Sequence, residues 1–294
     1  MNMTVDVIIP VYRPDEKFNK LIKMLGMQTL LPSKILIANT VDQEDTCKKT
    51  EETVRVNLDN RDIPIEVHPI NKPDYDHALT RQKMAGFSDS DAILFMTQDA
   101  VPKDRDLLKN LSDAIERGAG AAFARQEANE GAGITEKYTR LFNYGTESYE
   151  RTAEDFSKFG IKTIFCSDTC MIYDRAVFEK LGGFDQKSMF AEDMTYAFKL
   201  LNNGGKLAYV AEASVFHSHD LTLKENFRRS RALGKNQAQH PEIYKKLSSE
   251  KEGMKYVKYI IKSLFKERKP LKIPYFLLSC GARYLGVLKG RQDK

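Results

Sequence analysis

Short apolar runs alternate with helical patterns over the first hundred residues, and this alternation constrains the fold more than any other feature. The apolar runs cover residues 5–12, 33–40, 65–70 and 92–96. Helical patterns cover residues 15–28, 42–60 and 76–86 between them. Strands that are joined by crossover helices lie parallel in one sheet. The sequence therefore predicts an α/β fold with a mostly parallel central sheet and flanking helices.

A carboxylate follows the most apolar of these runs. Residues 92–96 are wholly apolar, as expected for an inner strand, and Asp99 comes just after them and before Pro102. Ligands of open α/β sheets bind at the carboxyl ends of the strands, so an acid there is placed to hold a divalent cation and a phosphate. The same spacing also fits an aspartate that caps the turn before Pro102.

The next segments extend this pattern. We expect a helix over 106–117, a strand over 121–125 and another strand over 163–173, which a helix follows to Leu181. Residues 126–162 between the two strands are polar and punctuated by glycine. An excursion of this length in a compact domain is usually functional, so we expect it to cross the active face.

Two further groups of side chains have metal-binding or acid–base chemistry. Glu192 and Asp193 begin a predicted helix, where the helix dipole also favours acids as simple caps. His217 and His219 follow the last predicted strand of this region. We expect at most one of these two histidines to face a metal held by Asp99.

Composition excludes several classes of protein. The chain has 294 residues, with 41% hydrophobic and 30% charged residues, as in an ordinary globular protein. It shows neither a signal-peptide pattern nor an apolar run of transmembrane length. Four scattered cysteines are too few for a disulfide framework, which favours the reducing cytoplasm.

Basic charge is concentrated at the C-terminus. Residues 224–294 hold 19 Lys and Arg against 6 Asp and Glu, a charge of +13 in a chain of net +5, which leaves about −8 for the first 223 residues. Such a block fits nucleic acid, an anionic membrane surface or a solvated face. We expect a membrane surface, because the predicted helix over 254–266 has an apolar stripe beside its lysines and the apolar patch 273–278 follows. The stripe consists of Met254, Val257, Ile260, Ile261, Leu264 and Phe265.

Several motifs, taken in order, resemble the family 2 glycosyltransferases of GT-A fold, and within them bacterial rhamnosyltransferases. The motifs are Val7-Ile-Ile-Pro-Val-Tyr12, Tyr75-Asp-His-Ala-Leu-Thr-Arg81, Met96-Thr-Gln-Asp-Ala-Val-Pro102, Gly182-Gly-Phe-Asp185 with Ala191-Glu-Asp193, and Phe216-His-Ser-His219. The chain departs from the family pattern twice. The usual metal-binding triplet has two acids, whereas Gln98 precedes Asp99 here, and Ala78 and Gln82 replace a glycine and an asparagine.

The resemblance implies a division of the chain. Residues 1–222 would form a Rossmann-like GT-A catalytic domain, with a nucleotide-binding half over about 1–103 and an acceptor-binding half over about 104–222. Residues 223–294 would add a basic, amphipathic helical region.

The resemblance also implies an activity. The protein would be a metal-dependent, inverting hexosyltransferase that moves L-rhamnose from dTDP-L-rhamnose onto a lipid-linked glycan acceptor in cell-surface polysaccharide synthesis. It would lie in the cytoplasm, peripherally on the inner face of the plasma membrane. The alternatives are another sugar nucleotide such as UDP-glucose or UDP-galactose, an inactive GT-A scaffold, or a basic nucleic-acid-binding protein.

Site residues follow from the matched motifs. Asp193 would be the catalytic base, with Glu192 shaping the site. Asp99 and one of His217 and His219 would hold Mn²⁺ or Mg²⁺. The predicted nucleotide-sugar-binding residues are Pro10, Val11, Tyr12, Asn39, Thr40, Asp76, Arg81, Gln98 and Asp99, with Arg81 as a phosphate contact.

Overall fold

The computed structural model describes residues 3–293 apart from 42–44, 60, 185–189 and 248–249, so Asp185 of the glycine motif lies outside the described residues. Within the described residues, nine strands form one sheet in the order β3-β2-β1-β4-β8-β6-β9-β5, with β7 paired to β9. The strands are β1 Val5–Val11, β2 Lys34–Val41, β3 Ile65–Asn71, β4 Ala92–Met96, β5 Val101–Pro102, β6 Ala121–Glu127, β7 Tyr149–Arg151, β8 Cys170–Asp174 and β9 Leu207–Phe216.

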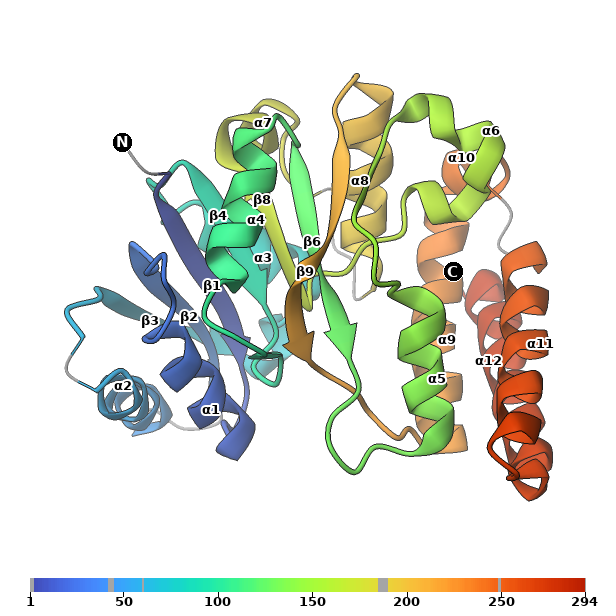
Figure 1. The fold of residues 1–294 in the computed structure, drawn as a ribbon. Coiled ribbons are helices and arrows are strands. Elements are labelled where there is room, and N and C mark those ends of the chain that lie inside the picture. The colour runs from blue at the N-terminus through green and yellow to red at the C-terminus, as the bar shows by residue number, and fades with distance from the viewer. Residues whose placement is uncertain (1–2, 42–44, 60, 185–189, 248–249, 294) are drawn as a thin grey trace.

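Helices cover both faces of this sheet (Figure 1). They are α1 Glu16–Leu25, α2 Asp45–Asn57, α3 His77–Ala85, α4 Leu107–Glu116, α5 Ile134–Asn143, α6 Phe156–Phe159, α7 Arg175–Lys180, α8 Glu192–Asn202, α9 Leu223–Gln239, α10 Pro241–Tyr244, α11 Glu250–Lys266 and α12 Ile273–Gln292. Apolar side chains of α1, α2 and α4 pack on one face, and those of α3, α7 and α8 pack on the other. The predicted α/β fold is confirmed.

The direction of the strands determines where the site forms. Strands β3, β2, β1 and β4 are parallel, as predicted, whereas β8 runs antiparallel to both β4 and β6. Strands β6 and β9 are parallel to each other. Strand β8 runs opposite to β1, β2, β4, β6 and β9. The carboxyl ends of those five strands and the start of β8 therefore meet at one edge of the sheet.

The prediction of a strand over 163–173 is wrong at its start, because β8 begins only at Cys170. Local polar bonds hold the preceding residues in turns: the Thr163 hydroxyl donates to the Asp155 carbonyl (3.0 Å), and the Thr169 amide donates to the Ser167 hydroxyl (3.3 Å). Hydroxyl side chains that bond to nearby backbone compete with a strand ladder. This turn leaves Asp168 at the active edge instead of inside a strand.

Residues 126–162, expected as a long polar excursion, contain the regular elements α5, β7 and α6. Helix α5 lies in this segment and packs against α11, and β7 pairs with the start of β9. Tyr138 of α5 contacts Tyr259 of α11 edge to face, with ring centroids 6.0 Å apart. The segment therefore joins the central sheet to the C-terminal helices, and Figure 1 shows α5 beside α9 and α11.

The C-terminal helices pack through glycines and a small apolar cluster. Gly286 and Gly290 of α12 lie against the backbone of α9, and a Cβ at Gly286 would lie 2.5 Å from the Phe227 carbonyl oxygen. Ile260 and Leu264 of the predicted α11 stripe are buried with Phe276. Part of the stripe thus forms internal contacts. Among the described residues, no helix is long and apolar enough to span a bilayer.

Gly286→Ala tests the close packing of α12 on α9. We expect a loss of about 1–3 kcal/mol in the free energy of unfolding, because the added methyl group forces the two helices apart. Gly281→Ala is the matched control on the same helix, since a Cβ there meets nothing within 4 Å and alanine favours helix. Denaturant titration of the two variants measures the difference. Equal stability of both would contradict the packing.

Candidate active site

Asp99, His217 and His219 converge at the carboxyl edge of the sheet. The Asp99 carboxylate lies after β4, with Oδ2 3.2 Å from His219 Nε2 and Oδ1 3.6 Å from His217 Nε2. The two Nε2 atoms are 3.1 Å apart. The expectation that at most one histidine faces Asp99 is therefore wrong. Side chains two residues apart in an extended segment lie on the same side, so the i, i+2 spacing allows both rings to face the Asp99 carboxylate.

A second layer of contacts orients His217. Its Nδ1 lies 2.9 Å from Gln126 Oε1, and the same oxygen accepts a hydrogen bond from Arg140 Nη1 (2.5 Å). Because that amide oxygen only accepts, His217 carries its proton on Nδ1 and keeps the Nε2 lone pair toward Asp99. Burial lowers the pKa of His217 well below 6.5 and also lowers the pKa of His219, so both imidazoles are neutral near pH 7.

These three residues fit a divalent cation. One ligand atom from each lies within 4.8 Å of the others. Neutral imidazoles and a carboxylate are ligands for first-row metal ions, and a hydrogen bond donated by the other ring nitrogen, here His217 Nδ1, is the usual outer support of a metal-bound histidine. The mixture of nitrogen and oxygen ligands suits Mn²⁺ better than Mg²⁺, which prefers oxygen.

A second group forms around a buried cation. Arg81 is 2% exposed, and its Nη1 lies 3.0 Å from Glu192 Oε1, while its Nε lies 3.6 Å from Asp168 Oδ2. The Tyr173 hydroxyl donates to the other Asp168 oxygen (2.6 Å). A buried guanidinium requires such partners, because isolated burial of a charge is strongly unfavourable. Arg81, predicted as a phosphate contact, is thus engaged by two acids.

Asp193 lies beside this cluster with a different set of partners. Its Oδ2 accepts from the Asp168 amide (3.1 Å) and its Oδ1 from its neighbour Met194 (2.7 Å). The preceding Ala191 has a φ of 65°, a left-handed conformation that non-glycine residues adopt rarely and often at functional sites. Backbone hydrogen bonds therefore orient the Asp193 carboxylate, whereas the ion pair with Arg81 holds its neighbour Glu192.

The three acids share one electrostatic environment. Burial raises the pKa of Asp168, Glu192 and Asp193, and their mutual repulsion adds to it for Asp168 and Glu192. Arg81 opposes the rise for all three. A carboxylate with a raised pKa binds a proton more tightly, so Asp193 is a stronger base than an aspartate in water.

A cavity of about 550 Å³ opens over these acids. Helix α9 forms part of its wall with Arg228 and Arg229, opposite elements of the catalytic sheet. The volume falls within the range of small-molecule sites. The remaining lining residues are His77, Arg81, Thr97, Tyr144, Phe165, Cys166, Ser167, Asp168, Thr169, Phe190, Ala191, Glu192, Asp193, Met194 and Ala232.

The other predicted nucleotide contacts lie along the ends of β1 and β2. The Gln98 side-chain amide makes two hydrogen bonds to the backbone of Tyr12: its Oε1 accepts from the Tyr12 amide (2.7 Å) and its Nε2 donates to the Tyr12 carbonyl (3.1 Å). Asn39 is buried and accepts from Thr50, and Asp76 caps α3 through the Leu79 amide. Val11 and Thr40 are buried and Pro10 is partly exposed. These residues shape the edge of the sheet through such contacts.

Sequence reasoning missed Asp168 and the two arginines of α9. The predicted strand over 163–173 includes Asp168, although the Ser-Asp-Thr run before Cys170 is a signal for a turn. Arg228 and Arg229 fall within the predicted basic region 223–294, where no local pattern tells a pocket-lining cation from a solvated one.

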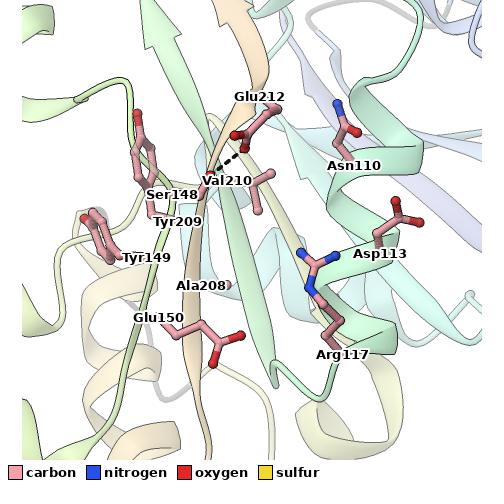
Figure 2. Close-up of a pocket in the computed structure, with 10 residues that line it drawn as sticks. All are labelled: Asn110, Asp113, Arg117, Ser148, Tyr149, Glu150, Ala208, Tyr209, Val210 and Glu212. Carbon is pink, nitrogen blue, oxygen red and sulfur yellow. Dashed lines mark hydrogen bonds between the residues drawn. The ribbon is translucent and has the colours of Figure 1, made fainter.

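A second cavity of about 440 Å³ lies between α4, β7 and β9 (Figure 2). Figure 2 shows Asn110 and Asp113 of α4, with Arg117 just after the helix, across from Glu212, whose carboxylate accepts a hydrogen bond from the Ser148 hydroxyl. None of the predicted site residues lines this cavity. The cavity over Asp193 is therefore the candidate active site.

The fold is that of the GT-A glycosyltransferases. A solved mannosyltransferase of Pyrobaculum calidifontis, PcManGT in complex with GDP-Man and Mn²⁺, superimposes with a TM-score of 0.66 at 14% identity, over 100% of this chain and 88% of that one. The chain belongs to glycosyltransferase family 2, because the model described as "Glycosyltransferase like family 2" matches residues 3–234.

Two relatives are similar over nearly the whole chain. The O-antigen chain rhamnosyltransferase RfbN of Salmonella typhimurium is 33% identical, over 98% of this chain and 90% of the relative. The O-antigen chain rhamnosyltransferase WbaN of Salmonella anatum is also 33% identical, over 97% of this chain and 88% of the relative. The predicted family is confirmed, and the protein is a glycosyltransferase.

Proposed function

We propose that the protein transfers L-rhamnose from dTDP-L-rhamnose to a glycan acceptor in cell-surface polysaccharide synthesis, with inversion at the anomeric carbon. The rhamnose assignment rests on the similarity to two O-antigen rhamnosyltransferases over nearly their full lengths. The site adds an acid with a raised pKa and a divalent-cation triad at one sheet edge. Together these features favour an active transferase over an inactive scaffold or a nucleic-acid-binding protein.

Asp193 is the proposed base. Its carboxylate takes the proton of the acceptor hydroxyl as that oxygen bonds to the anomeric carbon, and the bond from this carbon to the diphosphate breaks. A single displacement from the opposite side inverts the centre. Arg81, Asp168 and Glu192 hold the N-terminus of α8, and thereby Asp193, in place.

Asp99, His217 and His219 are the proposed ligands of Mn²⁺, and the bound ion would supply positive charge against the departing diphosphate. The adjacent ends of β1 and β2, with Tyr12 and Asn39, are the proposed nucleoside-binding edge.

We also propose that α12 contacts the inner face of the plasma membrane. Its buried face meets α9, while the opposite face exposes a continuous apolar surface that consists of Leu277, Leu278, Tyr284, Leu285 and Leu288. Leu271, just before the helix, is 92% exposed. An apolar patch in a region of charge +13 matches the interface of an anionic bilayer. The membrane-facing surface is thus on α12 more than on the α11 stripe.

Calorimetric titration with sugar nucleotides tests the donor and the metal site. We expect dTDP-rhamnose to bind in Mn²⁺, more weakly in Mg²⁺, and least in EDTA. Asp99→Ala should remove the gain from Mn²⁺, whereas the exposed Asp104→Ala should keep it. Tight binding of UDP-glucose, UDP-galactose or GDP-mannose in its place would replace the proposed donor. Equal affinity for the donor in Mn²⁺ and in EDTA would exclude a metal site at Asp99.

Asp193→Asn tests the base. We expect kcat to fall about 10²–10⁴-fold while donor affinity stays near that of the unaltered protein. Because the reaction needs the ionised carboxylate, kcat should rise with pH through the raised Asp193 pKa, above the usual 3.8. Rates measured from about pH 4 to about pH 9 check both points. Substantial turnover by the asparagine variant would assign the base to another residue.

Sedimentation with vesicles tests the membrane surface. We expect binding to vesicles that contain an anionic lipid, and weaker binding of the double variant Leu278→Glu and Leu285→Glu, which places charge on the apolar face of α12. Val56→Glu is the matched control, because Val56 is exposed on the distant helix α2. A double variant that binds as well as the control would rule out this surface.

A further inference from the structure

The imidazole of His77 is held at the active-site cavity by contacts to one of its two nitrogens. His77 begins α3 and lines the cavity over Asp193. Its Nδ1 lies 3.2 Å from Arg81 Nη1 and 3.3 Å from the Tyr75 hydroxyl oxygen. The Tyr75 ring also meets the imidazole edge to face, with ring centroids 5.2 Å apart. These contacts hold the imidazole in one orientation.

The contact with Arg81 decides which nitrogen of His77 carries the proton. A guanidinium only donates hydrogen bonds, so Nδ1 accepts and the proton of the neutral ring is on Nε2. Burial, together with the positive charge of Arg81, lowers the pKa of His77 to about 4, so the ring is neutral near pH 7. Nε2 has no hydrogen-bond partner among the described residues, and it is not one of their buried polar atoms. His77 therefore presents an unused N–H group.

Arg81 ties this imidazole to the segment that carries the proposed base. The same Nη1 atom that meets His77 lies 3.0 Å from Glu192 Oε1. Glu192 begins α8 and directly precedes Asp193. One guanidinium nitrogen thus joins the starts of α3 and α8, and His77, Glu192 and Asp193 line the same cavity.

The sugar that is transferred has to enter this cavity, because its anomeric carbon must come within reach of the acceptor hydroxyl that Asp193 deprotonates. The hydroxyl oxygens of a sugar accept hydrogen bonds, whereas an ionised carboxylate has only acceptor oxygens to offer them. The acids of the cavity therefore suit the hydrogens of sugar hydroxyls. A neutral N–H group at the same wall suits their oxygens.

We propose that His77 donates a hydrogen bond from Nε2 to a hydroxyl oxygen of the sugar that the enzyme transfers. The inference rests on the proposed function of the same cavity. Because Arg81 and Tyr75 already orient the ring, the bond requires little ordering when the sugar binds. A site that is built to bond a hydroxyl group discriminates against a sugar that lacks it. His77 is thus a binding residue that helps to select the donor sugar.

Calorimetry with dTDP-rhamnose and dTDP in Mn²⁺, without acceptor, tests this contact, because only dTDP-rhamnose has the sugar. We expect His77→Asn, which is too short to place a donor at the position of Nε2, to weaken dTDP-rhamnose binding roughly 10-fold and to leave dTDP binding unchanged. His77→Gln, whose amide nitrogen reaches the position of Nε2, should recover part of this loss. His68→Asn is the matched control, since His68 lies on β3 and does not line the cavity.

Two provisions keep the comparison decisive. His77→Phe, which keeps a ring but has no N–H group, replaces the asparagine variant if that variant does not fold. If another sugar nucleotide proves to be the donor, that nucleotide and its own nucleoside diphosphate replace dTDP-rhamnose and dTDP.

The outcomes separate this inference from the proposed function. If the unaltered protein binds no sugar nucleotide, the proposed function fails and the inference fails with it. If it binds the donor and the variants without the N–H group bind it equally well, only the inference is overturned. Equal losses for dTDP-rhamnose and dTDP would also overturn it, because the contact would then be to the nucleotide. A change confined to the KM for the acceptor would overturn it by placing His77 against the acceptor.

Discussion

The buried ion pairs of Arg81 are the interaction on which the active edge depends. Arg81 comes from α3, Asp168 from the turn before β8 and Glu192 from the start of α8. A guanidinium out of water needs its carboxylates, so these three segments are fixed to one another. Asp193 is adjacent to Glu192 and also bonds the Asp168 amide. The position of the proposed base therefore depends on the ion pairs of Arg81 with Asp168 and Glu192.

The antiparallel direction of β8 brings together the second part of the site, the cluster of Asp99, His217 and His219. Because β8 is antiparallel to both neighbours, β9 runs in the direction of β4 and its end meets Asp99 at the same edge. Gln126, at the end of β6, then orients His217. The proposed metal site and the cavity over Asp193 lie together here, at the carboxyl ends of the strands, where ligands of such sheets bind.

Helix α9 links this edge to the C-terminal region. One part of it, with Arg228 and Arg229, lines the cavity, and another part receives α12 through close glycine contacts at Gly286 and Gly290. Such close approach of two helix backbones leaves little freedom between them. A membrane contact on the outer face of α12 would therefore fix the direction in which the cavity faces, which suits an acceptor that is presented at a membrane surface.

The sequence by itself determined the parallel half of the sheet, the place of Asp99 after β4 and the place of Asp193 at the start of α8. These follow from local periodicity and from strand and helix ends, which neighbouring residues control. Only the tertiary structure decided that both histidines face Asp99, that Arg81 pairs with Asp168, and that α9 contributes to the cavity. Those contacts join segments far apart in the chain, and they depend on turns and on the burial of charge, which periodicity does not encode.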